Sequence, residues 1–261
     1  MTAFRQEGFE MLNYAYDSGI RYYDTAPGYG LAEQLLIDWV NEKNDPSITV
    51  ATKWGYTYMA NFDPNAKVHE VKEHSLNKLN MQWEVSKQLV PHLRYYQIHS
   101  ATLESGVLEN IGVLERLFEL KEEHNIKVGL TTTGSNQTEV LQKGIGVHYK
   151  GNPLFEVFQC TYNVLDQSMY TLGRQIISDK KQLVLKEVLA NGRLFPNTAY
   201  PGYMDLYKKV DVLSKKYEVG VDAINLQFCL SKLDGATVLS GANKPAYLAQ
   251  NLKATDFQLN T

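Results

Sequence analysis

The sequence has few of the features that mark secreted, metal-binding or membrane proteins. Only 2 of its 261 residues are cysteine. Cys160 and Cys229 both lie in apolar segments, which predicts buried thiols rather than a disulfide or a metal site. Apolar runs stay shorter than the ~18 residues of a membrane-spanning helix, and the N-terminus lacks the apolar core of a signal peptide. We therefore expect a soluble, cytoplasmic protein without a membrane partner.

Charge of one sign is not concentrated in any part of the chain. Lysine and arginine number 26 and the acidic residues 29, giving a formal net charge of −3. The sequence lacks the basic stripe that binds nucleic acid phosphates, so a nucleic acid partner is not expected. The length suits one large α/β domain, which we expect to cover residues 1–261.

Short β-rich runs alternate with longer segments of helical period along the whole chain. This alternation is typical of right-handed βαβ units around a parallel sheet. We expect a first helix around Phe4 to Ala15, which Ser18 and Gly19 terminate. Further helices are expected near residues 31–40, 68–81, 107–118, 168–179, 202–217, 221–232 and 244–252. Strands are expected at residues 20–24, 48–52, 95–99, 127–131, 155–161, 183–187 and 236–240.

This pattern predicts a (β/α)8 TIM barrel with seven visible strands. A closed barrel of this kind needs eight strands, and the missing one should precede the first helix. We therefore expect either that the chain is a fragment or that the protein has dispensed with its first strand. An open sheet edge beside the missing strand would invite a homo-oligomer.

Four polar side chains follow the expected strand ends. Asp24 ends the first strand, Tyr29 lies in the glycine-rich loop after it, Lys53 follows the second strand, and His99 ends the third. Reactive residues of such barrels lie at the carboxyl ends of the strands. Each residue alone has a structural explanation as a turn, loop or surface residue. Four such residues on consecutive strand ends predict a catalytic cluster instead.

Hydride transfer to a carbonyl group is a reaction that would use an aspartate, a tyrosine, a lysine and a histidine together. Negative charge grows on the carbonyl oxygen and must be met by a proton donor. Tyr29 could supply that proton if a cation stabilises the phenolate, and Lys53 fits that role. Asp24 could fix the ammonium of Lys53, and His99 could orient the substrate oxygen. The histidines at positions 69, 74, 92, 124 and 148 lack the spacing of metal ligands, and no role is predicted for them.

The segments Asp24-Thr-Ala-x-x-Tyr29-Gly, Thr52-Lys53 and Ile98-His99 resemble the active-site signature of the aldo-keto reductase superfamily. The resemblance extends over nearly the whole chain, including the segment 186–194. It implies an NAD(P)H-dependent oxidoreductase that interconverts a carbonyl group and an alcohol, with Tyr29 as general acid and base.

The same resemblance implies a set of cofactor contacts, although with departures from the family pattern. Thr131 and Thr132 stand where many relatives have Ser-Asn, and Lys186 stands where many stack a tyrosine on the nicotinamide. The other implied contacts match the family pattern or lie in a strand-to-helix turn suited to phosphates: Gln159, Ser240, Gly241, Asn243, Lys244 and Asn251. Tyr247 occupies the position of an arginine common in relatives that prefer NADPH. We expect NAD(H) or dual use, because a 2′-phosphate favours a guanidinium.

Trp54 and Tyr56 are the candidate substrate contacts, since they follow a strand end beside Lys53. The chain ends soon after the last expected helix, which predicts an open site for a small polar carbonyl compound or sugar.

Two other functions stay open. One is a non-catalytic barrel with a regulatory or scaffold role. The other is a lyase or isomerase that uses Lys53 as an imine former or His99 as a base.

Overall fold

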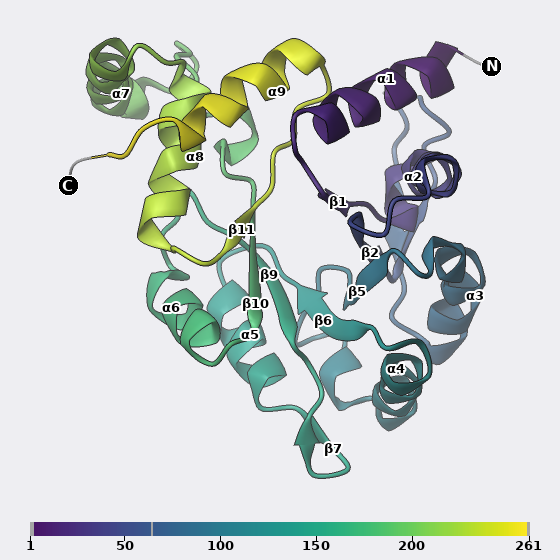
Figure 1. Ribbon diagram of the computed structural model, residues 1–261. Helices are drawn as coiled ribbons and strands as arrows, with labels where there is room; N and C mark the ends of the chain where they lie inside the picture. Colours follow the sequence, from purple (N-terminus) through teal and green to yellow (C-terminus); the bar gives the residue numbers. More distant parts are fainter. Residues whose placement is uncertain (1–2, 64, 260–261) are drawn as a thin grey trace. The chain divides into compact units, whose positions relative to one another are not determined.

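Seven strands in the described part of the chain form the main sheet, in the order β1-β2-β5-β6-β9-β10-β11 (Figure 1). The computed structural model describes residues 3–63 and 65–259. The strands are β1 (Tyr22–Asp24), β2 (Thr49–Trp54), β5 (Leu93–Ile98), β6 (Lys127–Thr131), β9 (Val157–Thr161), β10 (Gln182–Lys186) and β11 (Thr237–Val238). Each overlaps one of the seven strands expected from the sequence, which confirms the α/β class.

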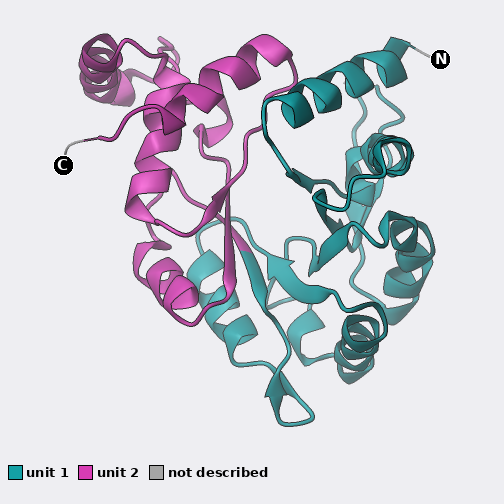
Figure 2. Ribbon diagram, viewed as in Figure 1, with its two compact units in different colours: residues 1–158 teal, residues 159–261 magenta. Residues whose placement is uncertain are grey.

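The chain divides into two units, Met1–Phe158 and Gln159–Thr261 (Figure 2). In unit 1 the strands β1, β2, β5 and β6 pair in parallel, with Asp24 beside Ala51 and Ile98 beside both Trp54 and Leu130. This register brings the carboxyl ends of the four strands to one edge. The helices of unit 1 are α1 (Ala3–Asp17), α2 (Ala32–Lys43), α3 (Leu76–Ser86), α4 (Ile111–His124) and α5 (Gln137–Ile145).

The core of unit 1 is apolar because its strands are buried along most of their length. Val50, Tyr96 and Val128 are fully buried, as expected for parallel strands that helices cover. Figure 1 shows α2, α3 and α4 along one side of β1, β2 and β5. Gly129 in β6 allows a close approach, because a Cβ atom there would lie 1.9 Å from the carbonyl oxygen of Val157.

Unit 2 contains the parallel pair β10 and β11, with Val184 beside Thr237. Its helices are α6 (Tyr170–Ser178), α7 (Met204–Tyr217), α8 (Val221–Lys232) and α9 (Pro245–Leu252), and α8 packs against both α7 and α9. Leu183 and Leu185 of β10 are fully buried. Cys160 and Cys229 are free and buried, which confirms the predicted buried thiols.

The helix expected over residues 68–81 is wrong in its first half. Glu70–Lys72 forms strand β4, which pairs antiparallel with β3 (Tyr56–Tyr58). Helix α3 begins only at Leu76, where Ser75 caps it by accepting a hydrogen bond from the Lys78 amide at 3.1 Å. The cap stops the helix from extending backwards, and pairing with a distant segment decides the structure before it.

Three further local differences from the expected elements lie between residues 107 and 153. Helix α4 begins at Ile111, behind the cap Asn110, and the residues Val107–Glu109 form a short 3₁₀ turn. Helix α5 was not expected, and neither was the small hairpin of β7 (His148–Tyr149) and β8 (Asn152–Pro153). The described residues supply seven strands of the main sheet, so closure of an eight-stranded barrel stays a prediction. Across residues 3–63 and 65–259, every helix is too short or too polar to cross a membrane.

Candidate active site

Three of the predicted catalytic residues lie where neighbouring parallel strands of unit 1 end. Asp24 is the last residue of β1, Lys53 is the next-to-last residue of β2, and His99 directly follows β5. Tyr29 ends the short 3₁₀ turn Pro27–Tyr29 between β1 and α2. The strand order β1-β2-β5 therefore carries the four residues to one edge of the sheet.

Lys53 is the centre of this cluster. Its side chain is 0% exposed, and its ammonium donates hydrogen bonds to Asp24 Oδ1 and, at 2.9 Å, to the carbonyl oxygen of Thr25. Burial lowers the pKa of Lys53, but the neighbouring Asp24 carboxylate and Tyr29 outweigh it and raise the pKa above its ordinary value. The side chain is therefore a buried cation at neutral pH.

Tyr29 lies over this cation and beside His99. The Lys53 nitrogen is 5.0 Å from the centre of the Tyr29 ring. The rings of Tyr29 and His99 meet edge to face, with centroids 5.5 Å apart. Because Tyr29 is 47% exposed, a molecule from solvent can reach the phenol without displacing the lysine beneath it.

The two predicted substrate residues lie at different depths. The ring of Tyr56 is 4.6 Å from that of His99, at the border of the cluster. The Cβ atom of Tyr56 also lies 3.1 Å from the position of a Cβ atom on Gly28, so a side chain there would crowd it. Trp54 is completely buried and packs edge to face against His74. Tyr56 therefore borders the cluster and stays a candidate substrate contact, whereas Trp54 lies in the core beneath it.

The two predicted cofactor residues of unit 1 follow one another at the end of β6. The hydroxyl of Thr131 accepts a hydrogen bond from the Ser100 amide at 2.8 Å, which ties β6 to the turn after β5. The Thr132 hydroxyl is buried and has no hydrogen-bond partner among the described residues. Burying a hydroxyl group without a hydrogen bond costs folding free energy, unless a bound molecule or a water supplies the missing partner.

In unit 2, Gln159 and Lys186 lie on neighbouring strands. Gln159 is a buried residue of β9, and Lys186 is the partly buried last residue of β10. The Lys186 ammonium lies 3.4 Å from Glu187 Oε1. The ion pair considered for Lys186 and Glu187 is therefore present.

The predicted phosphate-binding turn runs from Ser240 to Lys244, directly before α9. A Cβ atom at Gly241 would meet open space, so the backbone is accessible there. Asn243 and Lys244 lie between Gly241 and the first residue of α9.

Asn251 is engaged within unit 2. With its amide nitrogen directed at Asp222 Oδ2, 3.0 Å away, its oxygen accepts a hydrogen bond from Ser240 Oγ at 2.8 Å. This residue links α9 to the turn and to the start of α8. Contact with a cofactor would have to compete with these bonds.

The buried carboxylate of Glu33 lies next to Thr52, the residue before Lys53, and was not predicted from the sequence. Glu33 of α2 accepts hydrogen bonds from the hydroxyls of Thr52, at 2.5 Å, and Ser86, at 2.9 Å. Burial raises the pKa of Glu33, although both hydroxyls and the charge of Lys53 oppose the rise. A signal was present, because Glu33 shares the apolar helical face of Leu36, Ile37 and Val40.

The histidine at position 74, to which no role was given, lies beside the cluster. Its Nε2 atom is 2.9 Å from the carbonyl oxygen of His99. The sequence held no signal for this contact, because residue 74 was assigned to the middle of a helix.

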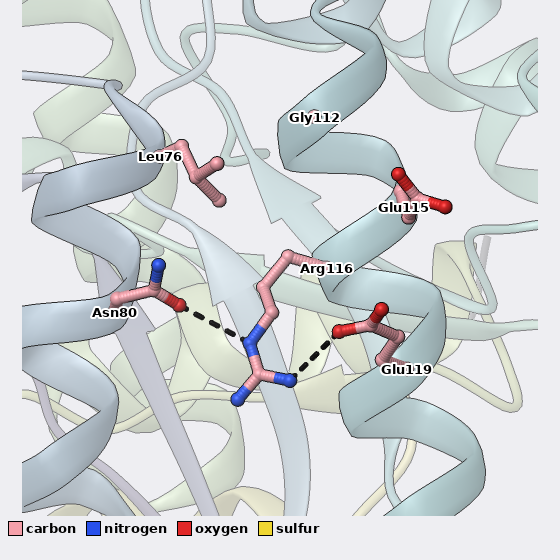
Figure 3. Close-up of a pocket in the computed structure, with 6 residues that line it drawn as sticks. All are labelled: Leu76, Asn80, Gly112, Glu115, Arg116 and Glu119. Atoms are coloured by element: carbon pink, nitrogen blue, oxygen red, sulfur yellow. Dashed lines mark hydrogen bonds and ion pairs between the residues drawn. The ribbon is translucent and has the colours of Figure 1, made fainter.

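A surface pocket of about 390 Å³ lies elsewhere in unit 1, between α3 and α4 (Figure 3). Arg116 crosses it, donating hydrogen bonds to Asn80 at 3.1 Å and Glu119 at 2.8 Å. Leu76, Gly112 and Glu115 complete its lining, which includes none of the predicted site residues. The cluster of candidate catalytic residues is therefore separate from this pocket.

Two known proteins resemble this chain in sequence over most of its length. A D-threo-aldose 1-dehydrogenase from a Pseudomonas species is 24% identical, over 94% of this chain and 82% of the relative. An NADH-specific methylglyoxal reductase from Escherichia coli K12 is 23% identical, over 98% of this chain and 85% of the relative.

Two solved structures are similar at low sequence identity. A glycerol dehydrogenase from Gluconobacter oxydans has a TM-score of 0.76 at 19% identity, covering 100% of this chain and 83% of its own. An aldo-keto reductase from Bacillus halodurans has a TM-score of 0.73 at 20% identity, covering 98% and 84%. The sequence model of the aldo/keto reductase family matches residues 3–261. Because that match spans almost the whole chain, the resemblance of the motifs is confirmed and the protein belongs to the aldo/keto reductase family.

Proposed function

We propose that this protein is an NAD(P)H-dependent oxidoreductase that interconverts a small carbonyl compound and its alcohol, with Tyr29 as general acid and base. The observation that carries the proposal is the fully buried Lys53 ammonium, held by Asp24 directly beneath the half-exposed Tyr29. Carbonyl reduction and alcohol oxidation both fit the aldose dehydrogenase and methylglyoxal reductase activities that the names of two relatives state.

The chemistry follows from the arrangement of these side chains. The reduced nicotinamide, when bound, supplies the hydride. Tyr29 donates its phenolic proton to the carbonyl oxygen as negative charge grows there. The Lys53 cation stabilises the phenolate that remains, and Asp24 holds the ammonium in place. The His99 ring, which meets Tyr29 edge to face, orients the same substrate oxygen.

The residues of unit 1 fit a nicotinamide cofactor. The buried Thr132 hydroxyl without a partner in the described residues stands at the end of β6, beside the strand end that carries His99. A carboxamide would satisfy it. In unit 2, the Ser240 to Lys244 turn is the proposed phosphate contact, and Gln159, Lys186 and Asn251 remain proposed cofactor residues.

We favour NAD(H) or dual use over strict NADPH dependence. Lys244 is the cation near the proposed phosphate turn, and its ammonium lies 5.9 Å from the ring of Tyr247. Tyr247 stands where an arginine would read a 2′-phosphate bidentately. Titration of both cofactors tests this preference, and NADPH binding at least about tenfold tighter than NADH binding would refute it.

The test of the proposed function compares wild type with Tyr29→Phe. Quenching of intrinsic fluorescence reports NADH and NADPH binding, and absorbance reports oxidation of the cofactor by methylglyoxal and small aldoses. We expect both proteins to bind cofactor and only wild type to turn over. Tyr170→Phe, at another exposed tyrosine, is the matched control and should behave as wild type.

Other outcomes of this test have distinct meanings. Binding without turnover by wild type would favour a regulatory or scaffold role. Borohydride trapping of a substrate on Lys53 without cofactor binding would favour a lyase or isomerase. Equal turnover by wild type and Tyr29→Phe would remove Tyr29 as the acid.

A further inference from the structure

The β3–β4 hairpin reaches the turn that carries His99 with two neighbouring side chains. Lys72, the last residue of β4, donates a hydrogen bond to the carbonyl oxygen of Ser100 at 3.0 Å. His74 Nε2 lies 2.9 Å from the carbonyl oxygen of His99. Two successive carbonyl groups after β5 therefore accept hydrogen bonds, one from the end of the hairpin and one from the segment that follows it.

This turn has a backbone conformation that needs support. Ser100 has a φ of +46°, in the left-handed region that residues with a side chain rarely adopt. From the side of β6, Thr131 accepts from the Ser100 amide through its hydroxyl and from the Ala101 amide through its carbonyl oxygen, both at 2.8 Å. Lys72 and His74 hold the turn from the other side. Strained conformations of this kind persist when their surroundings over-determine them.

The structure also determines the state of His74. A carbonyl oxygen only accepts, so Nε2 must carry the proton. The pKa of His74 is lowered to about 4, chiefly by burial and in smaller part by the charge of Lys72, against the opposing effect of the hydrogen bond to the His99 carbonyl. The ring is therefore neutral near pH 7, with its proton directed at His99.

The ring of His74 is seated by the three residues that join β2 to β3. Its centroid is 5.6 Å from the ring of Trp54 and 6.4 Å from that of Tyr56. Between them, Gly55 has a φ of +109°, and a Cβ atom there would lie 2.3 Å from the His74 ring. Glycine is thus required at position 55 for two reasons. Its backbone conformation is strained for other residues, and a side chain there would clash with the His74 ring.

We propose that Lys72 and His74 are positioning residues, which fix the main chain at His99 and Ser100 and thereby hold the His99 ring against Tyr29 and Tyr56. The role in catalysis rests on the proposed function. The positioning itself is a property of the free protein. Neither residue touches the reacting atoms in this scheme, and both act through His99.

The experiment uses two variants at each position. His74→Leu removes the donor, whereas the amide of His74→Gln keeps one at a similar reach. Lys72→Met and Lys72→Arg make the same comparison at an exposed residue, where loss of folding is not expected. His69→Leu, at an exposed histidine of the same hairpin, is the matched control.

The first readout is independent of activity. Histidine-labelled protein contains 6 histidines, and the ring signals of His99 are assigned by their loss in His99→Gln. We expect the His99 ring signals and their titration to change in His74→Leu and Lys72→Met, and to return toward wild type in His74→Gln and Lys72→Arg. Unchanged His99 signals in both His74→Leu and Lys72→Met would overturn the proposal.

The second readout is carbonyl reduction. We expect kcat/KM to fall about ten- to a hundredfold in His74→Leu, with unchanged NADH affinity and recovery in His74→Gln, because small displacements of a positioning group are costly. Equal losses in His74→Leu and His74→Gln would contradict the proposal. If wild type shows no reductase activity, the proposed function fails. The His99 signals still decide whether Lys72 and His74 position the His99 ring.

Discussion

The ammonium of Lys53, with no exposure to solvent, contacts the carboxylate of Asp24, whose side chain is 11% exposed. Removing one partner of a buried pair leaves the other charge uncompensated, which costs about 3–5 kcal/mol. In this protein the same pair also lies beneath the proposed proton donor. If the proposed function holds, substitutions at these positions should change stability and activity together.

The first prediction concerns this pair. Lys53→Met should lower the rate of carbonyl reduction by about a hundredfold or more, since Tyr29 loses the cation beneath it. Its thermal unfolding temperature should fall as well. Asp24→Asn with Lys53→Met should be more stable than Lys53→Met alone, because no unpaired carboxylate remains, yet equally inactive. Full activity of Lys53→Met would exclude the lysine from the chemistry.

His74 should make the protein sensitive to acid. Its pKa in the folded protein, about 4, lies below the ordinary histidine value of 6.5. The unfolded chain therefore binds a proton first as the pH falls, and stability is lost between about pH 6.5 and pH 4. Urea unfolding of wild type and His74→Gln across this range should show a weaker pH dependence in the variant. Identical slopes in the two proteins would contradict a partly buried, neutral His74.

Glu33 should make the stability of the protein depend on pH in the direction opposite to that of His74. Burial raises its pKa above the ordinary value, so the stability that Glu33 contributes at low pH is lost as the pH rises through the folded pKa. Glu33→Gln removes this titration. Relative to wild type, the variant should become more stable as the pH rises from about 4 to about 7. The free energy of unfolding at both pH values measures this, with Glu42→Gln, an exposed residue of the same helix, as control.

Gly129 should not tolerate a side chain. Alanine there would place its Cβ atom 1.9 Å from a backbone oxygen of Val157, and backbone moves only with its strand. We expect Gly129→Ala to destabilise the protein by about 3 kcal/mol. Gly112→Ala in α4 is the matched control, since its nearest contact would be an ordinary 3.5 Å, and it should be neutral or slightly stabilising. Thermal unfolding of both variants tests the difference.

Much of the fold was readable from local patterns. The alternation of apolar β-rich runs and helical periods gave all seven strands of the main sheet in the described residues, because buried parallel strands are continuous apolar segments. Element ends were less predictable. Residues 70–72 became a strand because they pair with Tyr56–Tyr58, a contact that no local pattern encodes.

The sequence by itself determined the family and the order of the four candidate catalytic residues, since each lies at or just after the end of a strand whose own residues predict it. Only the tertiary structure decided what surrounds them. Glu33 is buried because Thr52 and Ser86, distant in the sequence, bring hydroxyl donors to it. His74 contacts His99 because a hairpin, not a helix, precedes α3. Burial and hydrogen bonding between distant segments depend on how the chain packs, which spacing along the sequence does not specify.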